Sequence, residues 1–75
     1  MLDKLTLGEF IKVKRELLGY GKIEFSKMLG VGDDTLRSWE RNRFRPAGKN
    51  KDLLIKFLQL SNDEIDKFFY YKRLL

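Results

Sequence analysis

Five basic side chains and no acidic ones occur between residues 41 and 51 of this 75-residue chain, whereas the rest of the sequence mixes both signs of charge. The five are Arg41, Arg43, Arg45, Lys49 and Lys51. Guanidinium and ammonium groups bind phosphate oxygens through charge-assisted hydrogen bonds, and the whole chain carries a net charge of +5. The cluster therefore favours a polyanion such as nucleic acid as the partner. The alternative is that these residues form an ordinary solvated loop.

Catalytic and metal-binding chemistry finds little support in the same sequence. The chain contains no cysteine and no histidine, which removes the usual nucleophiles and bases and any Cys/His metal site. It has no glycine-rich phosphate loop, and its adjacent carboxylates, Asp33 and Asp34, fall at the end of a short predicted helix and not in a recognisable cleft. We therefore expect a binding protein that is not an enzyme and needs no cofactor or metal.

Helices must position these side chains, because apolar residues recur at helical spacing along the chain and no segment reads as a convincing strand. Thr6 with Glu9, and Ser61 with Glu64, have the spacing of capping boxes. Asp33 is expected to cap a helix of its own. The predicted helices lie at about 6–18, 22–29, 33–41, 51–60 and 62 to the end. The fold class is therefore all-α, with four to five helices in one domain that spans residues 1–75.

The segment from about 22 to 41 reads as two short helices joined by a glycine-containing turn. Ser26 is small enough to let the second helix approach closely, and Gly30 can adopt the positive φ that the turn needs. The apolar residues that would hold the two helices together are Phe25, Leu29, Val31, Leu36 and Trp39. This arrangement predicts a helix-turn-helix, with helices at about 51–74 completing the core.

Several short motifs in residues 10–46 form a pattern that can be compared with known families. They are Arg15 and Gly19, FSKMLGV at 25–31, Thr35-Leu36, and WERNRFRP at 39–46. This pattern resembles the Cro/CI-type (XRE) helix-turn-helix family of phage and bacterial transcriptional regulators. The resemblance implies a lambda-repressor-like domain that binds double-stranded DNA. The stretch PAGKNKDLLIKFL at 46–58 also resembles antitoxin-type members of the family, such as the MqsA and HigA groups.

The resemblance implies that the helix at about 33–41 enters the major groove of DNA. Arg37 is the best candidate for a specificity contact, because arginine can donate two hydrogen bonds to guanine O6 and N7. The alternative role of Arg37 is an ion pair with Asp33, one helical turn away. The base contacts implied are Asp33, Asp34, Arg37, Ser38 and Arg41. The phosphate contacts implied are Lys22, Asn42, Arg43 and Arg45.

Of two pairs of charged residues, one matches the family pattern and the other departs from it. Arg15 and Glu40 stand where family members have an internal ion pair between the first and third helices, and a structural role is expected for them. Asp33 and Asp34 depart from the family pattern, which has neutral polar or basic groups there. Carboxylates at these positions could cap the helix, could accept a hydrogen bond from cytosine N4, or could indicate weak DNA binding.

Four consecutive aromatic residues occupy the last predicted helix: Phe68, Phe69, Tyr70 and Tyr71. Because four neighbours point all around a helix, some of them are expected to be exposed or covered by a partner. We predict a homodimer formed through this helix, which would match a palindromic operator, with a monomer as the alternative.

The sequence therefore favours a repressor or autoregulator that binds a palindromic operator. A function of a different class stays open, namely an antitoxin or other protein-binding module whose aromatic C-terminal helix binds a toxin or another protein. No segment approaches the roughly 20 apolar residues of a membrane span, and the first residues lack the apolar run of a signal peptide. We expect a cytoplasmic protein with no membrane partner.

Overall fold

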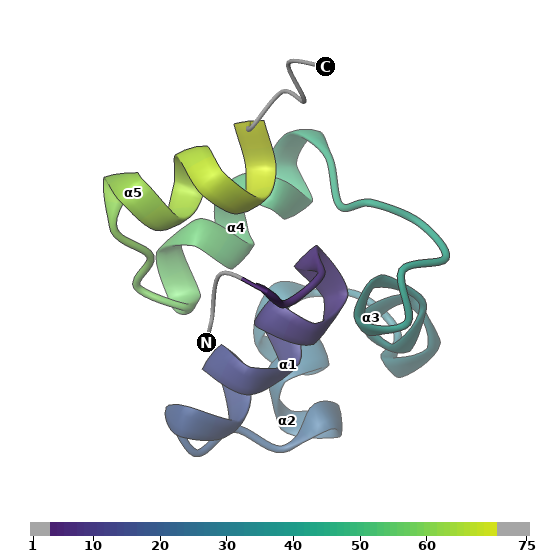
Figure 1. Cartoon of the computed structure of the whole chain (residues 1–75). Helices are drawn as coiled ribbons and strands as arrows, with labels where there is room; N and C mark the ends of the chain where they lie inside the picture. Colours follow the sequence, from purple (N-terminus) through teal and green to yellow (C-terminus); the bar gives the residue numbers. More distant parts are fainter. Residues whose placement is uncertain (1–3, 71–75) are drawn as a thin grey trace.

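The regular structure is entirely helical within residues 4–70, the part of the chain that the computed structural model describes (Figure 1). The elements in order are α1 (Leu7–Leu17), α2 (Lys22–Leu29), α3 (Asp33–Glu40), α4 (Gly48–Phe57), α5 (Asn62–Ile65) and η2 (Asp66–Tyr70), a π-helical continuation of α5. α1 lies between α3 on one side and the α5–η2 segment on the other (Figure 1). The predicted all-α class is confirmed.

Most helix ends lie where the sequence predicts them. Thr6 Oγ1 accepts a hydrogen bond from the Glu9 N–H at 3.1 Å, and the Glu9 carboxylate accepts one from the Thr6 N–H at 2.9 Å. Ser61 and Glu64 make the same two hydrogen bonds, at 3.1 and 2.9 Å. Both predicted capping boxes are thus confirmed, and each satisfies backbone donors that a helix start leaves open.

α4 begins at Gly48 and not, as predicted, at about Lys51. The carbonyl of Ala47 accepts a hydrogen bond from the Lys51 N–H at 3.4 Å, which closes the first turn earlier. Gly48 takes a φ of +57° at the point where the loop enters the helix, a conformation that glycine adopts without strain. The sequence prediction placed Gly48 in the loop together with Pro46.

One hydrophobic core connects the helices. Four apolar residues of the predicted helix-turn-helix, Phe25, Leu29, Leu36 and Trp39, are each at most 4% exposed, and Val31 packs against them. The buried members of the core are Leu7, Ile11, Phe25, Leu29, Leu36, Trp39, Leu54, Leu58 and Phe69. The core thus joins α2 and α3 to α1, α4 and η2. It holds α3 through the buried side chains on its inner face, Leu36 and Trp39.

Phe69 packs inward, so the prediction of an aromatic docking surface is wrong for this residue, whereas Phe68 is half-buried. Phe69 is buried in the core, and the ring of Phe68 stacks on that of Phe10 with centroids 3.8 Å apart. Both lie in η2, where i→i+5 hydrogen bonds widen the turn and reduce the angle between consecutive side chains. Tyr70 is exposed, and its hydroxyl accepts a hydrogen bond from Lys51 Nζ at 2.6 Å. Tyr71 lies outside the described residues.

Candidate functional site

α2 and α3 form a helix-turn-helix that follows the predicted geometry. Gly30 ends α2 with a φ of +75°, and the Val31 N–H donates to the Ser26 carbonyl at 3.0 Å. The side chain of Ser26 is buried between the helices, where its hydroxyl donates to the Ile23 carbonyl at 2.8 Å. A larger side chain at this position would separate α2 from α3, so the small residue fixes their spacing.

The exposed face of α3 presents two side chains of opposite charge next to each other. Asp33 Oδ2 and Arg37 Nη2 lie 3.9 Å apart, and each side chain is about half exposed, at 50% and 46%. Ser38 is half-buried farther along α3, and Arg41 is exposed directly after the helix. The structure therefore brings Asp33 and Arg37 together on an accessible surface, where a pairing between them contributes at most a few tenths of a kcal/mol.

Asp33 does not cap α3, which corrects that prediction. The N-cap is Gly32, whose carbonyl accepts hydrogen bonds from the N–H groups of Thr35 and Leu36 at 3.1 and 3.2 Å. Asp34 faces the first turn instead, and its Oδ1 accepts from the Thr35 N–H at 2.9 Å. Two carboxylates in the first turn suit the positive end of the helix dipole, which gives them a structural role beside any contact with a ligand.

A buried ion pair joins the far end of α3 to α1. Arg15 Nε lies 2.8 Å from Glu40 Oε2, Arg15 Nη2 lies 3.2 Å from Glu40 Oε1, and both side chains are only 5% exposed. Arg15 Nη1 also donates to the carbonyl of Tyr20 at 2.8 Å. The ion pair expected between Arg15 and Glu40 is therefore present, with two parallel hydrogen bonds that set the direction of α3 relative to α1.

The predicted phosphate-binding residues divide into two groups. Lys22 is the first residue of α2, and Arg43 is exposed in the loop that follows α3. Arg45 is exposed as well, but its Nη2 lies 3.4 Å from the carbonyl oxygens of both Phe68 and Phe69. Arg43 is thus open to a ligand and Lys22 is partly accessible, whereas Arg45 also bridges the loop to η2.

Asn42 is exposed between Arg41 and Arg43, but its side chain turns toward α1. Its Oδ1 accepts a hydrogen bond from the Gly8 N–H, and its Nδ2 donates to Thr6 Oγ1, both at 2.9 Å. Its backbone has a φ of +61°, in the left-handed region. The carboxamide is therefore occupied by the start of α1.

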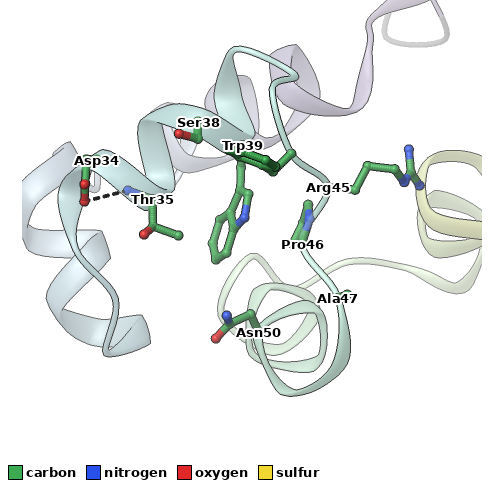
Figure 2. Close-up of a pocket in the computed structure, with 9 residues that line it drawn as sticks. Asp34, Thr35, Ser38, Trp39, Arg45, Pro46, Ala47 and Asn50 are labelled. Atoms are coloured by element: carbon green, nitrogen blue, oxygen red, sulfur yellow. Dashed lines mark hydrogen bonds between the residues drawn. The ribbon is translucent and has the colours of Figure 1, made fainter.

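Phe44 is a surface residue that the sequence analysis did not single out. Its ring is 69% exposed, although it belongs to the largest side chains of the chain. The only sequence signal was an apolar residue placed between Arg43 and Arg45 in a loop. Phe44 lines a hollow of about 460 Å³ between α3 and the start of α4, where the walls also include Trp39 and Pro46 (Figure 2). The remaining lining residues are Asp34, Thr35, Ser38, Arg45, Ala47 and Asn50.

The described part of the chain contains neither a metal site nor a membrane span. Residues 4–70 contain no group of three or more acidic side chains arranged to hold a metal ion. In the same range every helix is too short or too polar to cross a bilayer.

Comparison with known proteins gives two curated relatives. The chain is 36% identical over 66 residues to repressor protein C2 of Salmonella phage P22, which covers 88% of this chain and 31% of that protein. It is 37% identical over 57 residues to the HTH-type transcriptional regulator DicA of Escherichia coli (strain K12), which covers 76% of this chain and 42% of DicA. The chain therefore spans well under half the length of the curated relatives it matches. No protein-family model matches the sequence.

Two solved structures are similar over nearly their full length. The solution structure of the DNA-binding domain of the P22 C2 repressor superposes with a TM-score of 0.75 at 35% identity, covering 84% of this chain and 83% of that domain. The crystal structure of the P22 c2 repressor with synthetic operator 9T in the presence of Tl⁺ gives a TM-score of 0.76 at 30% identity, covering 88% and 97%. At these identities the likeness extends to the sequence as well as the fold.

Proposed function

The chain belongs to the Cro/CI-type (XRE) helix-turn-helix family of phage and bacterial transcriptional regulators, and we propose that it is a sequence-specific regulator that binds double-stranded operator DNA. Its lambda-repressor-like fold presents α3 as the recognition helix. The action proposed is that of a repressor or autoregulator, which needs only to occupy a promoter. No catalytic step is part of this proposal, and its setting is the cytoplasm, where such DNA is found.

The observation that supports this proposal best is the exposed α3 face beside a basic loop. Asp33 and Arg37 are accessible along α3, and Arg41 and Arg43 follow its C-terminal end. The P22 c2 repressor, which shares this fold, has been solved with a synthetic operator. An α-helix fits the major groove of B-DNA, and exposed arginines next to it reach the flanking phosphates.

Base recognition is assigned to the side chains of α3 and its last turn. Arg37 donates two hydrogen bonds to guanine O6 and N7, and Asp33 accepts one from cytosine N4 once its contact with Arg37 opens. The full set proposed for base contacts is Asp33, Asp34, Arg37, Ser38 and Arg41. Asp34 has a smaller part, because one of its oxygens already accepts from the Thr35 N–H.

Backbone recognition is assigned to Lys22, Arg43 and, in part, Arg45. Lys22 begins α2, where the open amides and the helix dipole favour a phosphate. Arg43 is exposed directly after the recognition helix. These contacts carry no sequence information, but they supply affinity that falls as salt rises.

A homodimer on a palindromic operator is part of the proposal, because two half-sites double the contacts that one domain makes. Phe69 does not supply its interface, since it is buried in the core, and half-buried Phe68 stacks on Phe10. The same finding weakens the support for an antitoxin that binds a toxin through an aromatic C-terminal helix. Tyr70 is the exposed aromatic side chain that remains on the described part of this segment.

Selection of binding sites from random duplex DNA tests the proposed function. We expect an enriched inverted repeat, bound more tightly than a scrambled duplex of the same length and composition, with an affinity that falls as salt rises. Enrichment of a single unrepeated site would contradict the dimer but not the regulator. If no sequence is enriched and all binding disappears at about 0.15 M salt, the regulator proposal is wrong.

A further inference from the structure

The side chain of Asn42 connects the end of α3 to the first turn of α1. Its Oδ1 accepts from the Gly8 N–H and its Nδ2 donates to Thr6 Oγ1, both at 2.9 Å. One carboxamide therefore uses its acceptor and its donor on two partners that follow each other closely in α1. The left-handed backbone of Asn42, with φ at +61°, is what turns the side chain back toward α1.

Gly8 shows how closely the two helices meet at this point. A Cβ atom at Gly8 would lie 2.5 Å from the carbonyl oxygens of both Trp39 and Glu40, so only glycine fits without movement of the backbone. The first turn of α1 thus rests directly on the last turn of α3. The amide end of one helix faces the carbonyl end of the other, which is a favourable arrangement of their dipoles.

α3 is consequently held to α1 at two separate places. Glu40 is fixed to Arg15 in the second half of α1, and Asn42 is fixed to Thr6 and Gly8 at its start. The core also holds α3 through Leu36 and Trp39. The two polar attachments add directional hydrogen bonds at the C-terminal end of α3, where they bear on the angle at which its exposed face projects from the domain.

We propose that Asn42 is a positioning residue, which sets the angle of the recognition helix through its hydrogen bonds to α1 and makes no phosphate contact. This replaces the role that the sequence pattern implied for Asn42, and it rests on the proposed function of binding operator DNA. Base contacts need side chains held at the correct distance from the base edges, whereas contacts to the backbone tolerate small rotations of the helix.

Two substitutions at position 42 distinguish positioning from phosphate contact. Asn42→Gly keeps the positive φ but removes both hydrogen bonds. Asn42→Asp keeps an acceptor for the Gly8 N–H and can accept from the hydroxyl of Thr6, but it adds a negative charge that a neighbouring phosphate would repel. Thr6→Val, with Thr6→Ser as its matched control, removes the hydrogen bond from Asn42 Nδ2 together with the N-cap of α1, and it leaves the Gly8 hydrogen bond to Asn42 in place.

The measurement is the affinity of each variant for the selected operator and for a scrambled duplex, at a temperature where unfolding curves show every variant to be folded. We expect Asn42→Gly to lose about tenfold in operator affinity, comparable to one lost base contact, and Thr6→Val to lose less because the Gly8 hydrogen bond remains. Both should change scrambled-duplex affinity by less than about twofold. Asn42→Asp and Thr6→Ser should bind the operator better than Asn42→Gly. Protection of the Gly8 amide from hydrogen exchange should be lost in Asn42→Gly.

Three results would overturn the positioning role. Equal losses on operator and scrambled DNA, with Asn42→Asp worse than Asn42→Gly, would identify a phosphate contact. Unchanged affinity for both duplexes in folded Asn42→Gly would mean that the hydrogen bonds are structural only. If the unaltered protein selects no operator, the proposed function itself fails, and the Gly8 amide still reports whether the attachment forms in solution.

Discussion

Arg15 Nε and Glu40 Oε2 lie 2.8 Å apart with each side chain 5% exposed, so the last residue of α3 is bound to α1 inside the protein. Removal of one charge leaves the other buried without its partner. We therefore expect Glu40→Leu to lower the free energy of unfolding by about 3–5 kcal/mol. Urea denaturation followed by circular dichroism measures this loss.

Two controls accompany the Glu40 substitution. Glu16 is 57% exposed and lies 4.0 Å from the same guanidinium, so Glu16→Gln should cost less than about 1 kcal/mol. The double variant Arg15→Met with Glu40→Leu removes both charges and should recover most of the loss. If Glu40→Leu and the unaltered protein have the same midpoint of urea unfolding, the role assigned to the ion pair is wrong.

Stability should fall in acid because of Glu64. The Ser61 N–H donates to the Glu64 carboxylate and lowers its pKa below the ordinary value, partial burial opposes this, and Lys14 Nζ at 3.2 Å lowers the pKa further. A carboxyl group with a lowered pKa stabilises the fold above its unfolded pKa and loses that contribution as pH falls through the folded value. Urea denaturation between about pH 6 and about pH 3 should show this decline.

Substitutions of Glu64 and of Lys14 separate the causes of the acid sensitivity. Glu64→Gln cannot ionise, so its stability should decline less steeply over the same acid range. Lys14→Met leaves the Ser61 hydrogen bond in place and should remove only part of the dependence. An unchanged slope in Glu64→Gln would assign the acid sensitivity to other carboxyl groups.

Gly8→Ala should destabilise the protein, although it adds only one methyl group. The added methyl group would lie 2.5 Å from two backbone carbonyl oxygens of α3, and backbone atoms cannot move aside as a flexible side chain can. Overpacking of this kind costs about 1–3 kcal/mol. Gly21→Ala is the matched control, because an added Cβ there meets nothing within 4 Å and φ is −74°. Equal stability of the two variants would show that α1 and α3 are farther apart in solution.

Arg37 and Arg43 should differ in the kind of binding that each supports. Arg37→Ala is expected to reduce discrimination at one base pair by about 1–3 kcal/mol. Arg43→Ala should weaken binding to all sequences alike and lower the slope of log affinity against log salt by about 0.9. Competition binding with single-base operator variants, repeated at several salt concentrations, measures both effects. Uniform losses in Arg37→Ala would place that residue on the DNA backbone.

The sequence predicted those features that depend on local spacing. The capping boxes at Thr6 and Ser61, the bounds of α2 and the buried apolar residues of the helix-turn-helix follow from helical periodicity and neighbouring turn residues. The ion pair of Arg15 with Glu40 came from family resemblance, because its partners are 25 residues apart and periodicity cannot relate them.

The features that the sequence did not predict depend on contacts between distant segments or on unusual backbone. Phe68 and Phe69 lie in a π-helical turn, which has no clear sequence signature, and their contacts are with residues far away in the sequence, such as Phe10. The hydrogen bonds of Asn42 need a left-handed residue that meets α1, 36 positions earlier in the case of Thr6. Base and phosphate assignments stay predictions for the DNA-binding experiments described above.

The contact between Asp33 and Arg37 has a consequence for how long the protein stays on the wrong DNA. In the free protein the charge of Arg37 is partly balanced by Asp33 at 3.9 Å, so this pair adds little attraction to a random phosphate backbone beyond that of the basic loop. A non-operator sequence does not place a guanine and a cytosine where they could replace the contact between the two side chains. Dwell times on such sites should therefore be short, and a protein that leaves wrong sites quickly spends less time searching a genome for the right one.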